Sequence, residues 1–113
     1  MFCASVVYSV DSEGFNFDYF RDHHAARFAE LLGDNCLHFE VHRGLEAPGA
    51  PPPPFLAAAY FWVSSAEAFG ATLAESGAEI FADIPNFSWT QPDRGWAEVA
   101  SAARSATRPP EPG

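Results

Sequence analysis

Two residues in the sequence could carry proton-transfer chemistry, and His24 is the first. It lies in the segment DYFRDHHAARFAELLGDN, residues 18–35, in the middle of an apolar helical stripe. Burial in such a stripe favours the neutral imidazole, which accepts a proton near neutral pH. We therefore predict that His24 acts as a general acid or base. The alternative is a core histidine that makes one hydrogen bond and has no chemical role.

The second candidate is Asp83, in the segment ADIPNF at residues 82–87. A carboxylate beside a catalytic histidine commonly orients the imidazole, and Asp83 could do so for His24. The alternative is a simple chain reversal, in which Pro85 sets the turn and Asn86 caps it. We predict His24 and Asp83 as the catalytic residues.

Aromatic residues are the candidates for binding a substrate. The tyrosines among them could donate a hydrogen bond to a substrate oxygen, or their hydroxyls could bond to the backbone within the core. Both interpretations stay open, because the sequence does not fix which sheet face meets the helices. Trp89 and Trp96 could cover either a pocket mouth or a dimer seam. The predicted substrate-binding residues are Tyr8, Phe20, Tyr60, Trp62, Phe87 and Trp89.

His38, Glu40 and His42 look like metal ligands, but strand geometry argues against a shared ion. At a rise of ~3.3 Å per residue, positions two apart are ~7 Å apart and positions four apart ~13 Å. The two histidines cannot easily share an ion, although either could join Glu40. There is no GxGxxG or GxxxxGK pattern to bind a nucleotide. A helical histidine is compatible with haem, but no second feature supports it, so we predict neither metal nor cofactor.

Composition limits the partners. The chain has 113 residues, enough for one domain, and its net charge is −9 with only six basic residues. Nucleic acids and anionic membranes both require a basic surface, so we expect neither as a partner. No apolar run reaches the ~18 residues of a membrane span, and no basic segment precedes the apolar start as in a signal peptide. We expect a cytoplasmic protein in which Cys3 and Cys36 are free thiols.

The elements that must position these residues follow from periodicity. Residues 2–10 and 55–63 are apolar on both faces, which predicts central strands. Residues 36–44 alternate between Leu37, Phe39, Val41 and a polar face, and residues 95–100 are short, so both are predicted edge strands. One predicted helix begins after Asn16, with Ser12 as the alternative start, and ends at Gly33–Asn35. It carries the stripe Phe17, Phe20, His24, Phe28 and Leu31. The other begins at a capping box, Ser64–Glu67, and ends before Pro85; Ser76–Gly77 could divide it.

The resulting order is β-α-β-β-α-β, a ferredoxin-like α+β sandwich over residues 1–100, followed by a flexible tail at 101–113. Two helices cover only one face of a four-stranded sheet. The other face of the central strands is also apolar, and monomers rarely expose so large an apolar patch. We therefore expect a homodimer in which two sheets meet face to face and form an α+β barrel.

Three segments resemble the EthD family of the dimeric α+β barrel superfamily: FDYFRDHHA at 17–25, FWVSSAEAF at 61–69 and ADIPNF at 82–87. The resemblance extends over roughly residues 2–100, and it places the family histidine at His24. In many relatives this histidine is followed by a small residue, a proline and an apolar residue. Here Ala25, Ala26 and Arg27 follow it, so no substrate is transferred from a relative.

Membership of this family implies a homodimer with a pocket between sheet and helices, but it does not imply one reaction. Related barrels include cofactor-free isomerases, cyclases and monooxygenases, whereas EthD itself is an accessory protein. We therefore expect cofactor-independent acid/base chemistry of the isomerase, cyclase or lyase type on a small hydrophobic molecule, in catabolism (including xenobiotic degradation) or secondary metabolism. The alternative is a non-catalytic protein that binds a ligand and supports a partner oxygenase.

Overall fold

The structure is a computed structural model that describes residues 1–103. Its elements are, in chain order, β1 (Phe2–Tyr8), α1 (Phe17–Tyr19), α2 (Ala26–Leu32), β2 (Cys36–Arg43), β3 (Ala57–Val63), α3 (Ala66–Asp83) and β4 (Asp93–Glu98). A π-helical turn, Phe20–Ala25, joins α1 to α2, and short 3-10 turns follow α2 (Gly33–Asn35) and α3 (Ile84–Asn86). Most of the predicted tail, residues 104–113, lies outside the described residues.

The four strands form one antiparallel sheet in the order β2-β3-β1-β4. The central positions of β1 and β3 were predicted from their two apolar faces, and the edge positions of β2 and β4 are also confirmed. Together with the order of the helices, this confirms the ferredoxin-like α+β fold. The strands are shorter than predicted for β1 and β3, and β4 begins two residues earlier, at Asp93.

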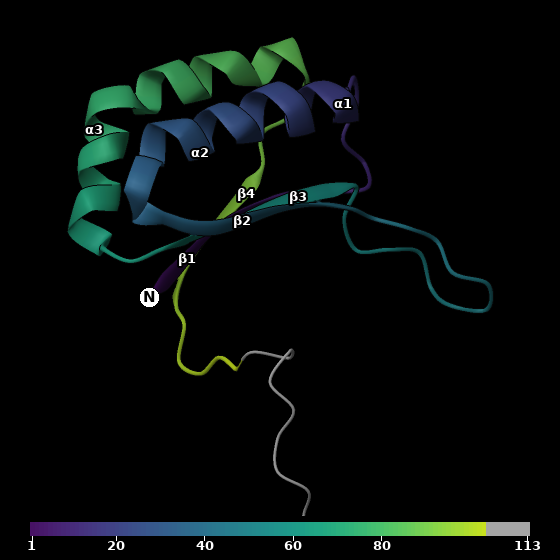
Figure 1. The fold of residues 1–113 in the computed structure, drawn as a ribbon. Helices are drawn as coiled ribbons and strands as arrows, with labels where there is room; N and C mark the ends of the chain where they lie inside the picture. The colour runs from purple at the N-terminus through teal and green to yellow at the C-terminus, as the bar shows by residue number, and fades with distance from the viewer. Residues whose placement is uncertain (104–113) are drawn as a thin grey trace, which may run out of the picture.

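Both helical segments lie over the same face of the sheet (Figure 1). No described helix covers the other side, which we call the open face. Side chains alternate along paired strands, so the pairing places every second residue of β1, β3 and β2 on this face. The open face carries Cys3, Ser5, Val7, Ala58, Tyr60, Trp62, His38, Glu40 and His42. The homodimer predicted to cover it stays a prediction.

The first helical segment begins and ends as the sequence predicts. The Asn16 side chain accepts a hydrogen bond from the backbone N–H of Tyr19, 3.1 Å away, and so caps the N-terminus. Gly33 ends the segment with a φ of 58°, a backbone conformation that glycine adopts without strain. The cap at Asn16 and the end at Gly33 define the helical segment that carries His24.

The π-helical turn changes which residues of this segment face the core. A π turn accommodates one more residue per turn than an α-helix, so the apolar stripe moves by about one position after it. Phe20, His24 and Ala25 are all buried within the turn, and beyond it Leu32 is buried whereas Leu31 is only half-buried. The predicted stripe is correct through Phe28, whose ring packs on Phe61 with centroids 4.9 Å apart, and it is displaced by one position at Leu32.

Helix α3 begins one residue later than the predicted capping box requires. Ser65, not Ser64, caps it by accepting a hydrogen bond from the N–H of Ala68 at 3.1 Å. Ser64 instead donates its hydroxyl hydrogen to Asn35 Oδ1 at 2.9 Å. The helix runs without interruption through Ser76 and Gly77, and Gly77 is buried beside Leu73 and Phe81 of the same helix. Asp83, the last residue of α3, lies against the first helical segment, where it contacts Tyr19 and His24.

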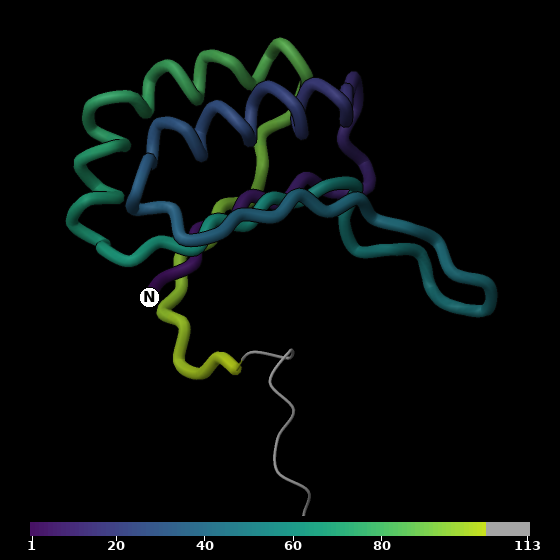
Figure 2. The backbone as a smooth tube through the Cα atoms, viewed as in Figure 1, coloured from purple at the N-terminus to yellow at the C-terminus, as the bar shows by residue number. Residues whose placement is uncertain are grey.

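Edge strand β2 departs from the predicted alternation at its start. The register shifts between Cys36 and His38, and Leu37 is exposed although its pattern predicted a dry face. Phe39 faces the helical layer and stacks on Phe61 with ring centroids 5.8 Å apart. The proline-rich loop that joins β2 to β3 projects away from the rest of the chain (Figure 2). It takes no part in the core.

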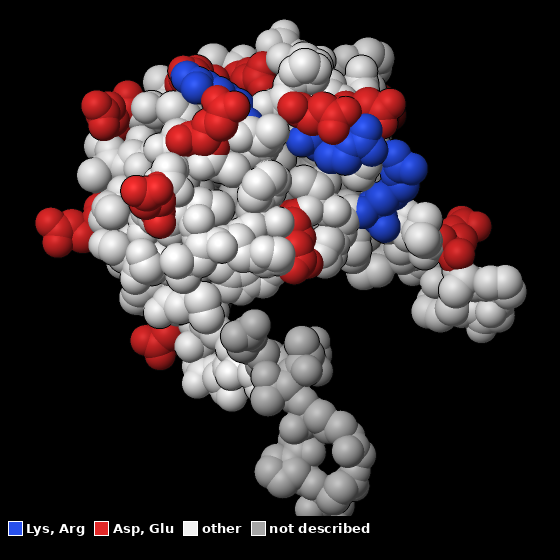
Figure 3. Space-filling view, in the orientation of Figure 1, with Lys and Arg blue, Asp and Glu red and all other residues white. Residues whose placement is uncertain are grey.

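Charge is spread over the outside of the helical layer. In Figure 3 the arginine side chains visible on this side lie beside carboxylates, and acidic groups are scattered around them. Across residues 1–103, no helix has both the length and the apolar character needed to cross a lipid bilayer.

Candidate functional site

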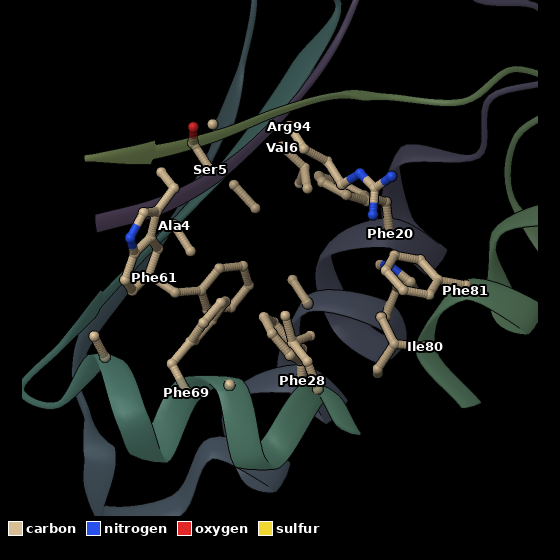
Figure 4. Close-up of a pocket in the computed structure, with 18 residues that line it drawn as sticks. Ala4, Ser5, Val6, Phe20, Phe28, Phe61, Phe69, Ile80, Phe81 and Arg94 are labelled. Atoms are coloured by element: carbon tan, nitrogen blue, oxygen red, sulfur yellow. The ribbon is translucent and has the colours of Figure 1, made fainter. Parts of the chain in front are cut away.

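A cavity of about 550 Å³ lies between the sheet and the helical layer. Its walls come from β1, β3 and β4 on the sheet side and from the π turn, α2 and α3 on the helical side (Figure 4). Most of the lining is aromatic or aliphatic: Phe28, Phe61, Phe69, Leu73, Phe81 and Trp96. This size and lining are typical of a site for a small apolar molecule.

His24 lines this cavity from the π turn. Its imidazole is buried, with the Phe87 ring 4.5 Å away and the Phe20 ring 6.1 Å away between centroids. The extra residue of the π turn is what allows both His24 and Ala25 to face inward. π turns of this kind occur frequently at functional sites.

Asp83 lies at the last residue of α3 and contacts the imidazole directly. Its Oδ2 is 2.9 Å from His24 Nδ1. The other oxygen, Oδ1, accepts hydrogen bonds from the Tyr19 hydroxyl at 2.7 Å and from the Asn86 amide at 2.9 Å. Three donors from two helical segments therefore hold the carboxylate in one orientation.

This arrangement fixes the tautomer of the histidine. An ionised carboxylate only accepts hydrogen bonds, so Nδ1 carries the hydrogen and Nε2 carries the free lone pair. Within the part of the chain that the structure describes, no residue forms a hydrogen bond with Nε2. The neutral ring therefore has a proton acceptor free for a molecule in the cavity.

Burial and hydrogen bonding act in opposite directions on the two groups. Burial lowers the pKa of His24, and the raising effect of Asp83 does not outweigh it. For Asp83, burial alone would raise the pKa, but hydrogen bonds from Asn86, Tyr19 and His24 together lower it below its usual value. The pair is therefore a neutral imidazole beside an ionised carboxylate at neutral pH.

Comparison with known proteins decides the family. The EthD domain family matches residues 10–91. This chain belongs to the EthD family. A search of curated proteins gives no match.

Solved structures agree with this assignment. An EthD-like protein from Ralstonia eutropha JMP134 is 34% identical to this EthD chain, with a TM-score of 0.81 over 94% of this chain and 96% of that one. An EthD family protein from Bacillus halodurans C-125 is 15% identical, with a TM-score of 0.68 over 87% and 97%. SnoaB from Streptomyces nogalater, a cofactor-independent oxygenase, is 13% identical, with a TM-score of 0.60 over 89% and 92%. At these lower identities the last two show the fold alone.

The structure brings some predicted site residues of this EthD protein together around the cavity. Phe20 lines it, and Phe87 lies behind His24. Tyr8 faces the helical layer but is enclosed by Phe15, Phe20 and Phe87, and it does not reach the cavity. Burial raises the pKa of Tyr8, and its hydroxyl has no hydrogen-bond partner among the described residues. The predicted tyrosine donor to a substrate is therefore not found at Tyr8.

The other predicted binding residues lie elsewhere. Tyr60 and Trp62 are on the open face, because they alternate with Ala59 and Phe61, which line the cavity. Trp89 is 77% exposed and lies over the loop before α1. A Cβ at Gly14 would come within 2.6 Å of its ring, so Trp89 covers that glycine and not the cavity mouth. Trp96, by contrast, lines the cavity and stacks on Phe69 at 4.6 Å.

Sequence reasoning missed two residues of this EthD site. Tyr19, a hydrogen-bond donor to Asp83, is half-buried beside His23 and could have been noticed as an aromatic residue one turn before the histidines. Arg94 lines the cavity from β4, in a strand whose start was predicted two residues too late. No sequence signal separates Arg94 from an ordinary surface arginine.

Three polar residues of β2, His38, Glu40 and His42, form a separate cluster on the open face. Glu40 accepts from His38 at 2.6 Å and from His42 at 2.8 Å, one oxygen for each histidine. Over residues 1–103, no group of three or more His, Cys, Asp or Glu side chains has an arrangement that could hold a metal ion. The hydrogen bonds to Glu40 explain why His38 and His42 both turn their Nε2 atoms toward it.

Proposed function

We propose that this EthD protein is a cofactor-independent acid/base catalyst of the isomerase, cyclase or lyase type. Its substrate is a small, mostly apolar molecule with an acidic C–H or O–H group. The observation that carries the proposal is His24, buried at an apolar cavity with Nδ1 bonded to Asp83 and Nε2 without a partner among the described residues. A neutral imidazole with an oriented lone pair is what a general base requires.

Each residue has one role in this reaction. The substrate bond to hydrogen breaks, the proton passes to His24 Nε2, and the electron pair stays on the substrate as a delocalised anion. Asp83 stabilises the imidazolium through the Nδ1 hydrogen bond, and Tyr19 and Asn86 hold Asp83 in place. Return of the proton to another atom gives an isomer, whereas loss of a leaving group or ring closure gives elimination or cyclisation.

The apolar walls support the same proposal. The phenylalanine and leucine side chains of the lining bind water poorly. Few water molecules are therefore expected around the negative charge that develops on the substrate. The fold also carries cofactor-independent chemistry in SnoaB, which lends support by analogy of fold only. We assign the reaction to catabolism or secondary metabolism. A cytoplasmic location is compatible with the free thiols of Cys3 and Cys36.

A homodimer completes the proposal. The open face carries Val7, Tyr60 and Trp62 at its centre, and no described element covers it. A second copy placed sheet to sheet would bury these residues and enclose the barrel. The cavity lies on the other side of the sheet, so each subunit would keep its own site.

Proton exchange tests the catalytic proposal without knowledge of the true substrate. The protein is incubated in D₂O with a panel of small apolar ketones and lactones, and loss of the α-proton signal is followed by NMR. We expect His24→Asn to slow exchange at least roughly 10²-fold, the usual contribution of a general base. His38→Asn is the matched control on the open face and should leave exchange unchanged.

Two outcomes would contradict the proposal. Equal exchange in the wild type and in His24→Asn would remove His24 from the reaction. Saturable binding of panel members in the cavity, with no exchange and no product, would instead favour the accessory role, in which the protein binds a ligand for a partner oxygenase.

A further inference from the structure

Arg94 is the one permanently charged side chain among the described residues that line the cavity. It lies in β4 opposite Val6 of β1, on the side of the sheet that faces the helices. Its guanidinium carbon is 4.9 Å from the centre of the Phe81 ring. Figure 4 shows the guanidinium at the end of the cavity where Phe20 and Phe81 also lie. Since His24 lies next to Phe20, the two polar groups belong to the same end of the site.

Arg94 differs from the other described arginines in its partners. Arg21, Arg27 and Arg43 each form an ion pair with a carboxylate, at distances of 2.7, 2.8 and 3.9 Å. Arg94 forms no ion pair with any residue among 1–103. The whole chain has 15 acidic and six basic residues, so Arg94 does not lack a carboxylate partner because acidic residues are scarce. Within residues 1–103 the guanidinium therefore has no carboxylate partner beside the apolar cavity.

The remaining lining offers no competing charge. Ser5 is among the lining residues, but its hydroxyl points away from the cavity in Figure 4. His24 and Arg94 are then the titratable or charged side chains of the lining. One is a proton acceptor and the other is a permanent cation with several N–H donors.

We propose that Arg94 binds the oxyanion formed when His24 removes a proton, so that the substrate is a small apolar molecule with an enolisable carbonyl or a phenol. The inference rests on the proposed function of His24. The C–H or O–H bond breaks, its proton goes to Nε2, and its electron pair becomes negative charge on the substrate oxygen. That oxygen accepts hydrogen bonds from the Arg94 guanidinium, while the hydrocarbon part of the molecule contacts the aromatic walls.

Geometry supports this role for an arginine in particular. The guanidinium is planar and stays charged at all working pH values, and its donors are fixed relative to one another. Contact with the Phe81 ring restrains its position through a cation–π interaction. A cation that is positioned before the charge develops stabilises the anion more than the neutral substrate, which is the requirement for catalysis.

A matched pair of probes tests the proposal by binding alone. 4-Nitrophenol at a pH where it is ionised and 4-nitroanisole at the same pH have nearly the same shape, but only the first carries an oxyanion. We expect the wild-type protein to bind the phenolate at least about tenfold more tightly than the ether, the scale of a charge-assisted hydrogen bond. Titration is followed by the visible absorbance of the phenolate and by quenching of tryptophan fluorescence.

Variants separate the residues. Arg94→Gln should lose the preference for the phenolate and keep the affinity for 4-nitroanisole, and Arg94→Lys should restore part of the preference. His24→Asn should keep the preference, because the probe is already deprotonated. Arg21→Gln is the control at a paired arginine outside the cavity, and circular dichroism checks that each variant is folded.

The outcomes distinguish the two proposals. If the wild type binds both probes equally, or if Arg94→Gln keeps the preference, the role of Arg94 is overturned while His24-dependent proton exchange can still stand. If neither probe binds to the wild type, the cavity is not a binding site for such molecules and both proposals are overturned.

Discussion

Two histidine–carboxylate clusters lie on opposite faces of one sheet, and they use the same chemical groups in different surroundings. On the helix-covered face, His24 contacts Asp83 at 2.9 Å, and 9% of its side chain is exposed. On the open face, Glu40 contacts His38 and His42 at 2.6 and 2.8 Å, and 60% of the His38 side chain is exposed. Distance does not distinguish the clusters, but burial and the arrangement of partners do.

The pKa shifts of His24 and Glu40 have different causes. Burial lowers the pKa of His24, so its ring stays neutral next to an ionised carboxylate. At Glu40, hydrogen bonds from His42 and His38 lower the pKa of the carboxyl group. Each Glu40 oxygen has a histidine, whereas Asp83 gives one oxygen to His24 and the other to two neutral donors. Only the Asp83 cluster leaves one oriented imidazole nitrogen facing an apolar cavity.

The largest expected effect comes from removing the charge of the buried carboxylate. Asp83→Asn keeps the size of the side chain but no longer fixes the Nδ1–H tautomer or stabilises the imidazolium. We expect proton exchange to slow roughly 10²-fold, mainly in kcat, with little change in KM, because Asp83 is a positioning residue that does not touch the substrate. Steady-state NMR exchange at several probe concentrations measures both constants.

The matched control for that variant is Glu40→Gln on the open face. It removes the carboxylate of the exposed cluster and should leave both constants unchanged. A similar loss in the two variants would mean that the effect is on the fold and not on the site, and the contrast between the clusters would fail.

Most of the fold could be predicted from the sequence because the pattern of apolar residues along each strand indicates which of its faces are buried. The two apolar faces of residues 2–8 and 57–63 place β1 and β3 at the centre, and strand order follows. His24 is the clearest site prediction, since an ionisable residue in an apolar stripe is conspicuous. The proximity of Asp83 could be proposed but not measured, because it depends on how α3 lies against the first helical segment.

What escaped prediction depends on tertiary geometry. The π turn at Phe20–Ala25 has no composition signal, and it displaces the stripe so that Leu32 replaces Leu31 in the core. Strand parity placed Tyr60 and Trp62 on the open face, because the face that meets the helices is chosen by packing and not by the strand sequence. Arg94 acquires its role only when β4 pairs with β1 and turns its side chain toward the helices.

A smaller effect is expected from the open face itself. In the proposed homodimer Trp62 lies near the centre of the interface, and Trp62→Arg places a charge there. We expect the dimer to dissociate roughly 30-fold more readily, equivalent to the ~2 kcal/mol of an interface hot spot. Light scattering and sedimentation at micromolar concentrations measure the change, while probe binding in the cavity should persist.

The same substitution at another tryptophan provides the control. Trp89 is exposed and lies outside the open face, so Trp89→Arg should leave the mass unchanged. A wild-type protein that is monomeric at micromolar concentrations, or equal masses for the two variants, would refute the sheet-to-sheet dimer.

The smallest expected effect is the pH dependence of stability. Because burial lowers the pKa of His24 below its ordinary value of 6.5, the unfolded chain takes up this proton at a higher pH than the native protein. The free energy of unfolding should therefore fall as the pH drops below ~6.5 and level off once the pH passes the native pKa, by ~1.4 kcal/mol for each unit of lowering. Urea unfolding between pH 8 and pH 5, compared with His24→Asn, isolates this contribution. Asp83 adds a second loss of stability only below pH ~3.8, since its native pKa is also lowered.

If the wild type and His24→Asn lose the same stability between pH 8 and pH 5, His24 is not held neutral by burial, and the distinction between the buried and exposed clusters disappears.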